Sequence, residues 1–201
     1  VLLQQLALLK EYGLKAMDPN GPDFVHVVVE ATKLAFADRE AFYGDPKFVD
    51  TPMETLLSDA YNGARRDLID MDKASLDFRP GKIEGYGGEI DYAAHVAAGS
   101  QDFAKFGIGE PTVGKQGQVQ GDTCHVDVID RHGNMVACMP SGGWLQSSPT
   151  IPDLGFCLNS RAQMFWLEEN RPATLAPGKR PRTTLSPSMA LKDGEPYMAF
   201  G

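Results

Sequence analysis

The chain has 201 residues, which is the size of one large domain and long enough to bury a hydrophobic core. Hydrophobic residues make up 42% and charged residues 23%, a globular composition that excludes disordered and fibrous classes. No apolar run approaches the roughly 18 residues that span a bilayer, so no membrane span is expected. The net charge of −8 disfavours nucleic-acid binding because the chain repels phosphates.

The first third of the sequence predicts three helices. Apolar residues recur at helical spacing over residues 1–12. A longer helix is expected between the start signal Asn20-Gly21-Pro22 and the stop signal Gly44-Asp45-Pro46. Thr51-Pro52-Met53-Glu54 has the spacing of a capping box and predicts a third helix that runs to about Ile69.

A glycine-rich stretch separates this helical part from a part that predicts strands. Ten of the 21 glycines lie between Phe78 and Gly121 without sustained periodicity, which is typical of a poorly ordered linker. After Thr123 the pattern predicts a β-hairpin from Cys124 to Met139. Further short strands are expected at 155–158, 188–191 and 197–200, with a tight turn between the last two.

The residue that opens the β-rich part, Thr123, is a candidate nucleophile. If the bond between Asp122 and Thr123 were cut, the Thr123 hydroxyl would lie beside its own α-amine, whose ordinary pKa is about 8. One residue would then supply both the nucleophile and the general base. The same residues also fit an ordinary loop end before a strand, and local spacing alone does not decide between the two.

Three separated motifs occur in the chain in a fixed order. They are EATKLAFADR at 30–39 with GDPKFV at 44–49, TCHVDVID at 123–130 with Gly133-Asn134, and GKRPRTTLSP at 178–187. Together they resemble the γ-glutamyltranspeptidase family of N-terminal-nucleophile hydrolases. The resemblance implies an α/β fold class, an αββα sandwich in which two antiparallel sheets lie between helical layers.

The resemblance also implies a precursor that cleaves itself between Asp122 and Thr123. Residues 1–122 would be the C-terminal part of a large subunit, with the glycine-rich linker at 78–121, and residues 123–201 the start of a small, catalytic subunit. The two subunits would remain associated. Family members need no metal or organic cofactor, so none is expected.

Further roles follow from the same resemblance. Ser141, eighteen positions after Thr123, is implied to hydrogen-bond the nucleophile, although a turn serine fits the local sequence too. Thr183 and Thr184 fall where the family has two adjacent serines that contact the substrate carboxylate, but two such hydroxyls could equally cap a turn. The neighbouring basic residues either attract an acidic acyl group or form a solvated face; they are Lys179, Arg180 and Arg182.

Two positions depart from the family pattern. Where transpeptidases place a Gln and an Asp that hold the γ-glutamyl α-amine, this chain has Arg161 and Met164. Methionine is a poor hydrogen-bond acceptor, and arginine repels an ammonium group. We therefore expect Arg161 to favour an acyl donor without that amine, a glutaryl-like or other dicarboxylic amide, as in the acylase-like branch of the family.

These observations predict an N-terminal-threonine amide hydrolase or acyltransferase that acts on small γ-glutamyl-type or dicarboxylic amides. Two alternatives stay open: a catalytically incompetent homologue that acts as a binding module, and an uncleaved fragment. We expect a fragment across the subunit junction, because the chain opens without Met on a helix-like pattern and closes on a strand-like one. The oxyanion donors of the family follow a strand resembling 197–201 and would lie beyond these residues. These 201 residues alone are then expected to show little turnover. A homo-oligomer and either a cytoplasmic or a periplasmic or secreted location are compatible with the sequence.

Histidines and cysteines offer weaker candidates. His125 and His132, with Asp127 or Asp130, suggest a metal site, but no third ligand has a helpful spacing. The three cysteines lack the paired spacing of a zinc site or the density of a disulfide scaffold and predict reduced core thiols; they are Cys124, Cys138 and Cys157.

Overall fold

The structure is a computed structural model that describes residues 1–87, 123–142 and 148–201. The chain divides into two compact units. The first combines Val1–Val96 with Phe165–Arg182, and the second combines Ala97–Met164 with Thr183–Gly201. Most of the predicted linker, 88–121, lies outside the described residues. Within the described ranges, no helix is both long enough and apolar enough to span a bilayer.

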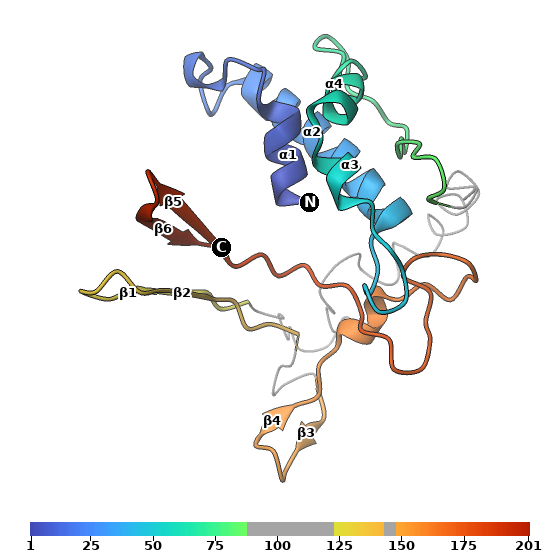
Figure 1. Cartoon of the computed structure of the whole chain (residues 1–201), viewed down its shortest axis with the longest axis vertical. Coiled ribbons are helices and arrows are strands. Elements are labelled where there is room, and N and C mark those ends of the chain that lie inside the picture. The colour runs from blue at the N-terminus through green and yellow to red at the C-terminus, as the bar shows by residue number, and fades with distance from the viewer. Residues whose placement is uncertain (88–122, 143–147) are drawn as a thin grey trace, which may run out of the picture. The chain divides into compact units, whose positions relative to one another are not determined.

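Helices build most of the first unit (Figure 1). They are α1 (Leu2–Leu9), the short 3-10 helix η1 (Leu14–Ala16), α2 (Pro22–Phe42), α3 (Met53–Leu57) and α4 (Asp59–Arg66). Helix α2 confirms the long helix predicted from the sequence, with Pro22 in its first turn, where a missing amide hydrogen costs nothing. Its buried face includes Ala31, Leu34 and Ala35, which pack with Leu8 of α1.

The single helix predicted from Thr51 to about Ile69 is wrong, because two short helices occupy that range. Ser58 is extended between them, and its Oγ accepts the Tyr61 backbone N–H at 3.2 Å as the N-cap of α4. Thr51 caps no helix; its hydroxyl donates to the Phe42 carbonyl at 3.2 Å. A serine that caps a helix offers the backbone an alternative to continuing it, and the apolar spacing does not reveal that choice.

A buried carboxylate on α2, that of Asp38, joins three parts of the first unit. The residue is fully buried. Its oxygens accept hydrogen bonds from Gln4 Nε2 at 2.6 Å, Tyr61 Oη at 3.0 Å, Arg65 Nη2 at 3.1 Å and the Gly81 backbone N–H at 2.7 Å. Asp38 therefore ties α1, α4 and the loop after α4 to the C-terminal part of α2.

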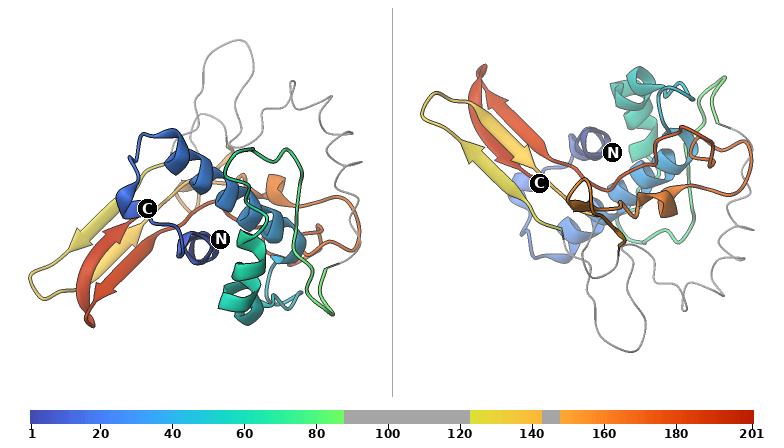
Figure 2. Two further views of the ribbon diagram at one scale, coloured as in Figure 1. Left: turned by 90° about the horizontal axis from the view of Figure 1, so that it is seen from above. Right: turned by 90° about the horizontal axis from the view of Figure 1, so that it is seen from below.

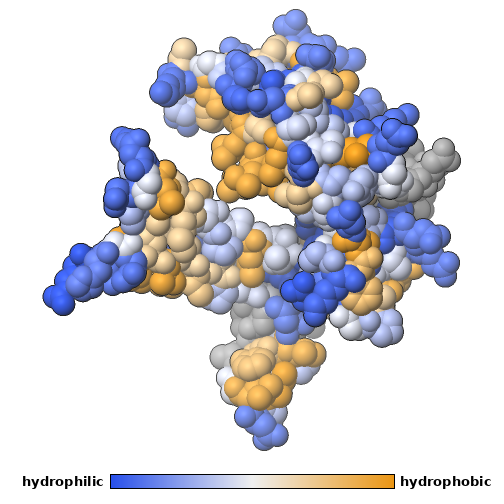
Figure 3. Space-filling view, viewed as in Figure 1, coloured by the Kyte–Doolittle hydropathy of each residue, from blue (hydrophilic) through white to orange (hydrophobic). Residues whose placement is uncertain are grey.

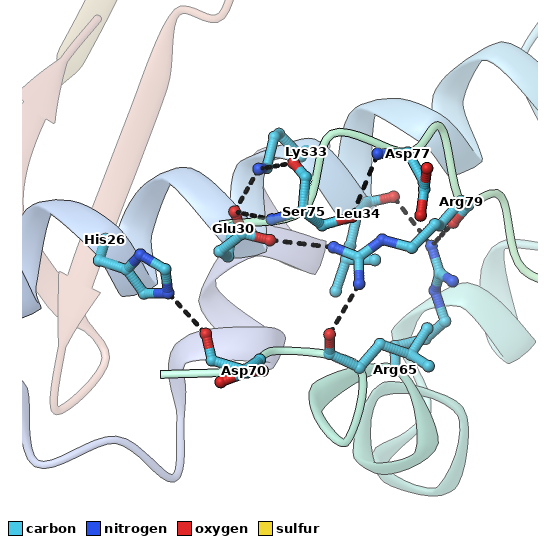
Figure 4. A network of polar contacts seen from close by, with 10 residues as sticks. His26, Glu30, Lys33, Leu34, Arg65, Asp70, Ser75, Asp77 and Arg79 are labelled. Atoms are coloured by element: carbon cyan, nitrogen blue, oxygen red, sulfur yellow. Dashed lines mark hydrogen bonds and ion pairs between the residues drawn. The ribbon is translucent and has the colours of Figure 1, made fainter. Parts of the chain in front are cut away.

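Two turns earlier on α2, Glu30 holds the same loop (Figure 4). Its buried carboxylate pairs with Arg79 at 2.9 Å, accepts the Ser75 N–H at 3.2 Å and contacts Lys33. Burial alone would raise the pKa of Glu30, but the hydrogen bonds from Lys33 and Ser75 outweigh it and lower that pKa. Glu30 therefore stays ionised and keeps the loop fixed to α2.

We expect replacement of Asp38 by asparagine to lower the free energy of unfolding by about 3 kcal/mol, because the buried Arg65 guanidinium would lose its carboxylate partner. Urea unfolding of the full chain, followed by circular dichroism, measures this change. Asp59→Asn is the matched control, since it removes only the exposed ion pair with Lys10. Equal midpoint shifts in the two variants would contradict the role of Asp38.

The second unit contains three antiparallel hairpins and a short 3-10 helix. They are β1 (Val126–Ile129) with β2 (Met135–Cys138), β3 (Thr150–Ile151) with β4 (Phe156–Cys157), β5 (Ser188–Lys192) with β6 (Glu195–Phe200), and η2 (Arg161–Met164). The hairpins β1–β2 and β5–β6 confirm the prediction and lie side by side (Figure 2). The strand β3 has no counterpart in the sequence analysis. Asp193 and Gly194, with φ of 55° and 85°, make the two-residue turn of β5–β6.

Apolar side chains of these hairpins are largely exposed. More than half of each side chain is accessible at Val126, Leu154, Phe156 and Leu191, and apolar surface covers the β3–β4 hairpin (Figure 3). The prediction of core thiols is wrong for Cys124 and Cys138, which are exposed because they lie on such a hairpin. The stacking of two sheets between helical layers stays a prediction.

Candidate active site

The hydroxyl oxygens of Thr123 and Ser141 lie 2.8 Å apart and share a hydrogen bond. Thr123 comes shortly before β1, and Ser141 comes shortly after β2. Between them the Cys124 backbone N–H donates to the Pro140 carbonyl at 3.3 Å, which extends the ladder toward the open end of the hairpin. Because antiparallel strands bring their outer ends together, the separation of eighteen residues becomes a direct contact.

The turn of this hairpin sets the register that aligns the two hydroxyls. Asp130 accepts the His132 N–H at 2.8 Å, the Asn134 N–H at 3.0 Å and the Asn134 side-chain amide at 2.8 Å, while Gly133 adopts a φ of 83°. The hydrogen bonds from Asn134 lower the pKa of Asp130, so the turn keeps its charged acceptor. A slip of one residue would move Ser141 to the opposite face.

Arg161 lies against the residue that follows Ser141. It is 4% exposed, and its backbone N–H donates to Asn159 Oδ1 at 2.6 Å. The Ser160 N–H donates to the Gly142 carbonyl at 2.5 Å. Gly142 has a φ of 86°, and a Cβ built on it would lie 2.9 Å from Arg161 Nε. The lack of a side chain at Gly142 thus lets the Arg161 guanidinium approach the backbone at the residue after Ser141.

The other predicted substrate contacts lie on a different segment. Thr183 and Thr184 are exposed before β5, and Thr183 Oγ1 accepts the Leu185 N–H at 3.1 Å, which is the turn-capping geometry. In the part of the chain that the structure describes, the hydrogen bonds of Thr183 reach neither Thr123 nor Ser141. The structure therefore brings together Thr123 and Ser141 and places Arg161 against the neighbouring Gly142, and it leaves the substrate contacts of Arg161 and of the two threonines as predictions.

The partners of the basic residues next to Thr183 were not predicted from the sequence. Arg180 pairs with Asp45 at 3.0 Å, and Arg182 pairs with Glu40 at 2.7 Å. The sequence does carry a general signal for such pairs, since residues 1–122 hold 12 basic and 20 acidic groups and residues 123–201 hold 7 of each. That excess does not say which carboxylates take part.

The histidines are engaged in local contacts. His125 Nε2 lies 2.7 Å from Asp127 Oδ2, and Arg131 Nε donates to His132 at 3.1 Å. Over the described ranges, no three residues drawn from His, Cys, Asp and Glu gather in a way that could hold a metal ion.

The sequence of this chain matches the model of a known protein family. The model described as gamma-glutamyltranspeptidase matches residues 1–201, which is the whole chain. The chain belongs to the γ-glutamyltranspeptidase family. The resemblance stated from the three motifs is thereby confirmed.

Three curated relatives of this chain are named as proenzymes. Acylase ACY 1 proenzyme of Pseudomonas sp. (strain SE83) is 31% identical over 201 residues, which are 100% of this chain and 30% of the relative. Glutathione hydrolase proenzyme of Bacillus subtilis subsp. natto is 28% identical over 100% of this chain and 32% of its own length. Oxamate amidohydrolase proenzyme of Klebsiella pneumoniae subsp. pneumoniae is 30% identical over 94% of this chain and 29% of its own length. The chain thus spans about 30% of the first relative's length.

Solved structures show the same kinship. LmbA2991HD is 46% identical with a TM-score of 0.70, and the match covers 98% of this chain and 31% of that one. Cephalosporin acylase from Bacillus halodurans is 24% identical with a TM-score of 0.66, over 98% of this chain and 29% of its own. At that identity it shows a common fold only. The helices and antiparallel sheets predicted for the γ-glutamyltranspeptidase family are therefore confirmed as the fold class.

Proposed function

We propose that this chain carries the self-cleavage site and the nucleophile of an N-terminal-threonine amide hydrolase or acyltransferase. The hydrogen bond of 2.8 Å between the hydroxyls of Thr123 and Ser141 is the observation that carries the proposal. The names of the relatives, which are proenzymes of acylases and hydrolases, support it. Because the chain spans about 30% of the first of these relatives, turnover is to be measured on the whole protein that contains it.

Self-cleavage needs only the residues at the junction and water. The Thr123 Oγ attacks the carbonyl carbon of Asp122, the new C–O bond replaces the peptide C–N bond, and the Thr123 nitrogen takes the proton. Water then hydrolyses the ester, which leaves a carboxylate on Asp122 and a free α-amine on Thr123. The Ser141 hydroxyl, in hydrogen-bond contact with Oγ, holds it in one orientation for attack.

The same oxygen then acts on substrates. The free α-amine of Thr123 takes the Oγ proton as Oγ attacks an amide carbonyl, and it returns that proton to the departing amine. This leaves the acyl group as an ester on Thr123. Water or a second amine attacks the ester, releases the acyl group and restores the hydroxyl.

A dicarboxylic amide suits the charge of the site. The Arg161 side chain carries a guanidinium and lies against Gly142, the residue after Ser141. A positive charge in this buried position attracts the free carboxylate of a glutaryl-like acyl group and repels the ammonium of a γ-glutamyl group. Arg161 is therefore assigned to the acyl side of the substrate.

The pH dependence follows from the general base. An ordinary α-amine has a pKa of about 8, and only its neutral form can take the Oγ proton. We expect kcat/KM of the whole protein to rise about tenfold per pH unit below pH 7 and to level off above about pH 8. A pH profile of anilide hydrolysis measures this. A flat profile from about pH 5 to 9 would exclude the free amine as the base.

An intact mass spectrum of the purified protein tests the cleavage. The wild-type protein is expected to give two masses that break between Asp122 and Thr123, whereas Thr123→Ala gives one. A single uncut mass for both proteins would contradict the proposal and favour a homologue that has lost its chemistry.

A further inference from the structure

The first unit contains a segment that follows Thr123 in the sequence. This segment, Phe165–Arg182, is here called the strap, and it packs with the helices that precede the predicted cleavage site. The strap is closed on itself, since the Trp166 N–H donates to the Ala173 carbonyl and the Leu175 N–H donates to the Trp166 carbonyl, both at 2.9 Å. Ala173 is 2% exposed. A cut before Thr123 would therefore leave the strap and α2 on different polypeptides.

Glu40 near the end of α2 binds both ends of the strap. Its Oε2 accepts the indole N–H of Trp166 at 3.2 Å and Arg182 Nη1 at 2.7 Å. The Arg182 side chain is 9% exposed and that of Glu40 19%, so solvent screens this ion pair only weakly. The Arg182 guanidinium also lies 6.0 Å from the centre of a Trp166 ring. One carboxylate thus fixes two strap residues sixteen positions apart.

Asp45, in the loop after α2, binds the strap a second time. Its side chain is fully buried and accepts the Arg180 backbone N–H at 2.8 Å and Arg180 Nη2 at 3.0 Å. The Arg180 hydrogen bonds hold the pKa of Asp45 well below its usual range. Because that pKa is depressed, the contribution to stability is present above the ordinary value of 3.8 and is lost only as the pH falls below it.

Gly44 lets the strap backbone approach. A Cβ built on Gly44 would collide with the Pro172 carbonyl oxygen and lie 2.7 Å from Val49 Cγ2. The strap thus meets the end of α2 through its backbone at Pro172 and through the side chains of Trp166, Arg180 and Arg182.

We propose that the strap is a clasp that holds the two products of cleavage together, with Glu40 and Asp45 of the large subunit binding Arg180 and Arg182 of the small one. The inference rests on the proposed cleavage before Thr123. The clasp ends at Arg182, directly before Thr183 and Thr184, so it also fixes the start of the segment that carries those hydroxyls. Its partner is the other half of the same chain.

The test uses two routes to a cut chain. In one, the full chain processes itself. In the other, Thr123→Ala prevents self-cleavage, and a sequence-specific protease cuts a recognition site placed within residues 100–110. Each cut protein is passed over a size-exclusion column in 0.1 M and in 1 M NaCl. The Debye length is about 10 Å at the lower concentration and about 3 Å at the higher one, so the higher salt screens the ion pairs more strongly. The fraction of the two products that elute together is measured.

Two double variants test the clasp. The first variant combines Glu40→Gln with Asp45→Asn, and the strap variant combines Arg180→Gln with Arg182→Gln. Asp50→Asn is the matched control, because its carboxylate binds Tyr86 Oη at 2.8 Å within residues 1–122. Circular dichroism of the uncut variants checks that they fold. The single variant Arg180→Gln stays informative if a double variant does not fold, because the Arg180 side chain is 66% exposed.

Wild type and control are expected to elute as one complex, and either clasp variant is expected to raise the dissociation constant of the two products roughly tenfold or more. Co-elution of the variant products as tight as in wild type, at both salt concentrations, would overturn the clasp. Failure of the first route alone would contradict self-cleavage, while the second route would still decide on the clasp.

Discussion

Replacement of Thr123 by alanine is expected to abolish amide hydrolysis, with a fall in kcat of about 10⁴-fold or more in the whole protein. Thr123→Ser keeps an oxygen at the same place and is expected to retain both cleavage and measurable turnover. Ser141→Ala should lie between them, with a loss of about 100-fold in kcat, because the nucleophile keeps its oxygen but loses the partner 2.8 Å away that orients it.

Steady-state kinetics on a single anilide substrate ranks these variants. Ser188→Ala is the control for Ser141→Ala, since the Ser188 hydroxyl donates to the Ser186 carbonyl at the start of β5 and is outside the hydroxyl pair. A kcat of Ser141→Ala within about twofold of the control would remove Ser141 from the account. Undiminished turnover of Thr123→Ala would remove Thr123.

Arg161→Gln is expected to change the preference between acyl donors. In the wild-type protein, glutaryl anilide should be hydrolysed with the larger kcat/KM and γ-glutamyl anilide with the smaller. Loss of the buried guanidinium should lower the ratio of the two values by about 10- to 100-fold, since a hydrogen bond to a charged group contributes roughly 1.5–3 kcal/mol. The KM for the glutaryl substrate should carry most of the change.

Two controls accompany the measurement of the donor preference of Arg161→Gln. Arg131→Gln removes an exposed arginine at the turn of β1–β2 and should leave the ratio unchanged. Retained hydrolysis of γ-glutamyl anilide by Arg161→Gln shows that the variant is folded. A wild-type protein that hydrolyses γ-glutamyl anilide much faster than glutaryl anilide would contradict the assignment of Arg161.

The parts of the fold that the sequence predicts are those with local signals. Pro22 and the apolar stripe after it predict α2, and the Asp193-Gly194 pair predicts the turn of β5–β6. The contact between Thr123 and Ser141 was expected from the family resemblance, and in the structure a single hairpin brings the two hydroxyls together. Ser58 shows the limit, since one hydroxyl that caps α4 divides the predicted third helix.

Contacts between distant segments carry no comparable signal. Asp45 and Arg180 are 135 residues apart, and Glu40 and Arg182 are 142 apart. The local sequence around Arg180 and Arg182 does not indicate whether their side chains pair with a buried carboxylate or face solvent. Their role therefore could not be predicted. Thr183 likewise has a turn-capping geometry that its local sequence permits as readily as a substrate contact.

The central claim is that Thr123 becomes an N-terminal nucleophile, and the mass of the small fragment tests it most directly. The whole protein is mixed briefly with glutaryl anilide, quenched in acid and analysed by intact mass and peptide mapping, beside Thr123→Ala. The account predicts a fragment that begins at Thr123 and gains one glutaryl group on that residue, with neither cleavage nor adduct in the variant. A glutaryl group found on Cys124 or Ser141, or on an uncut chain, would contradict it.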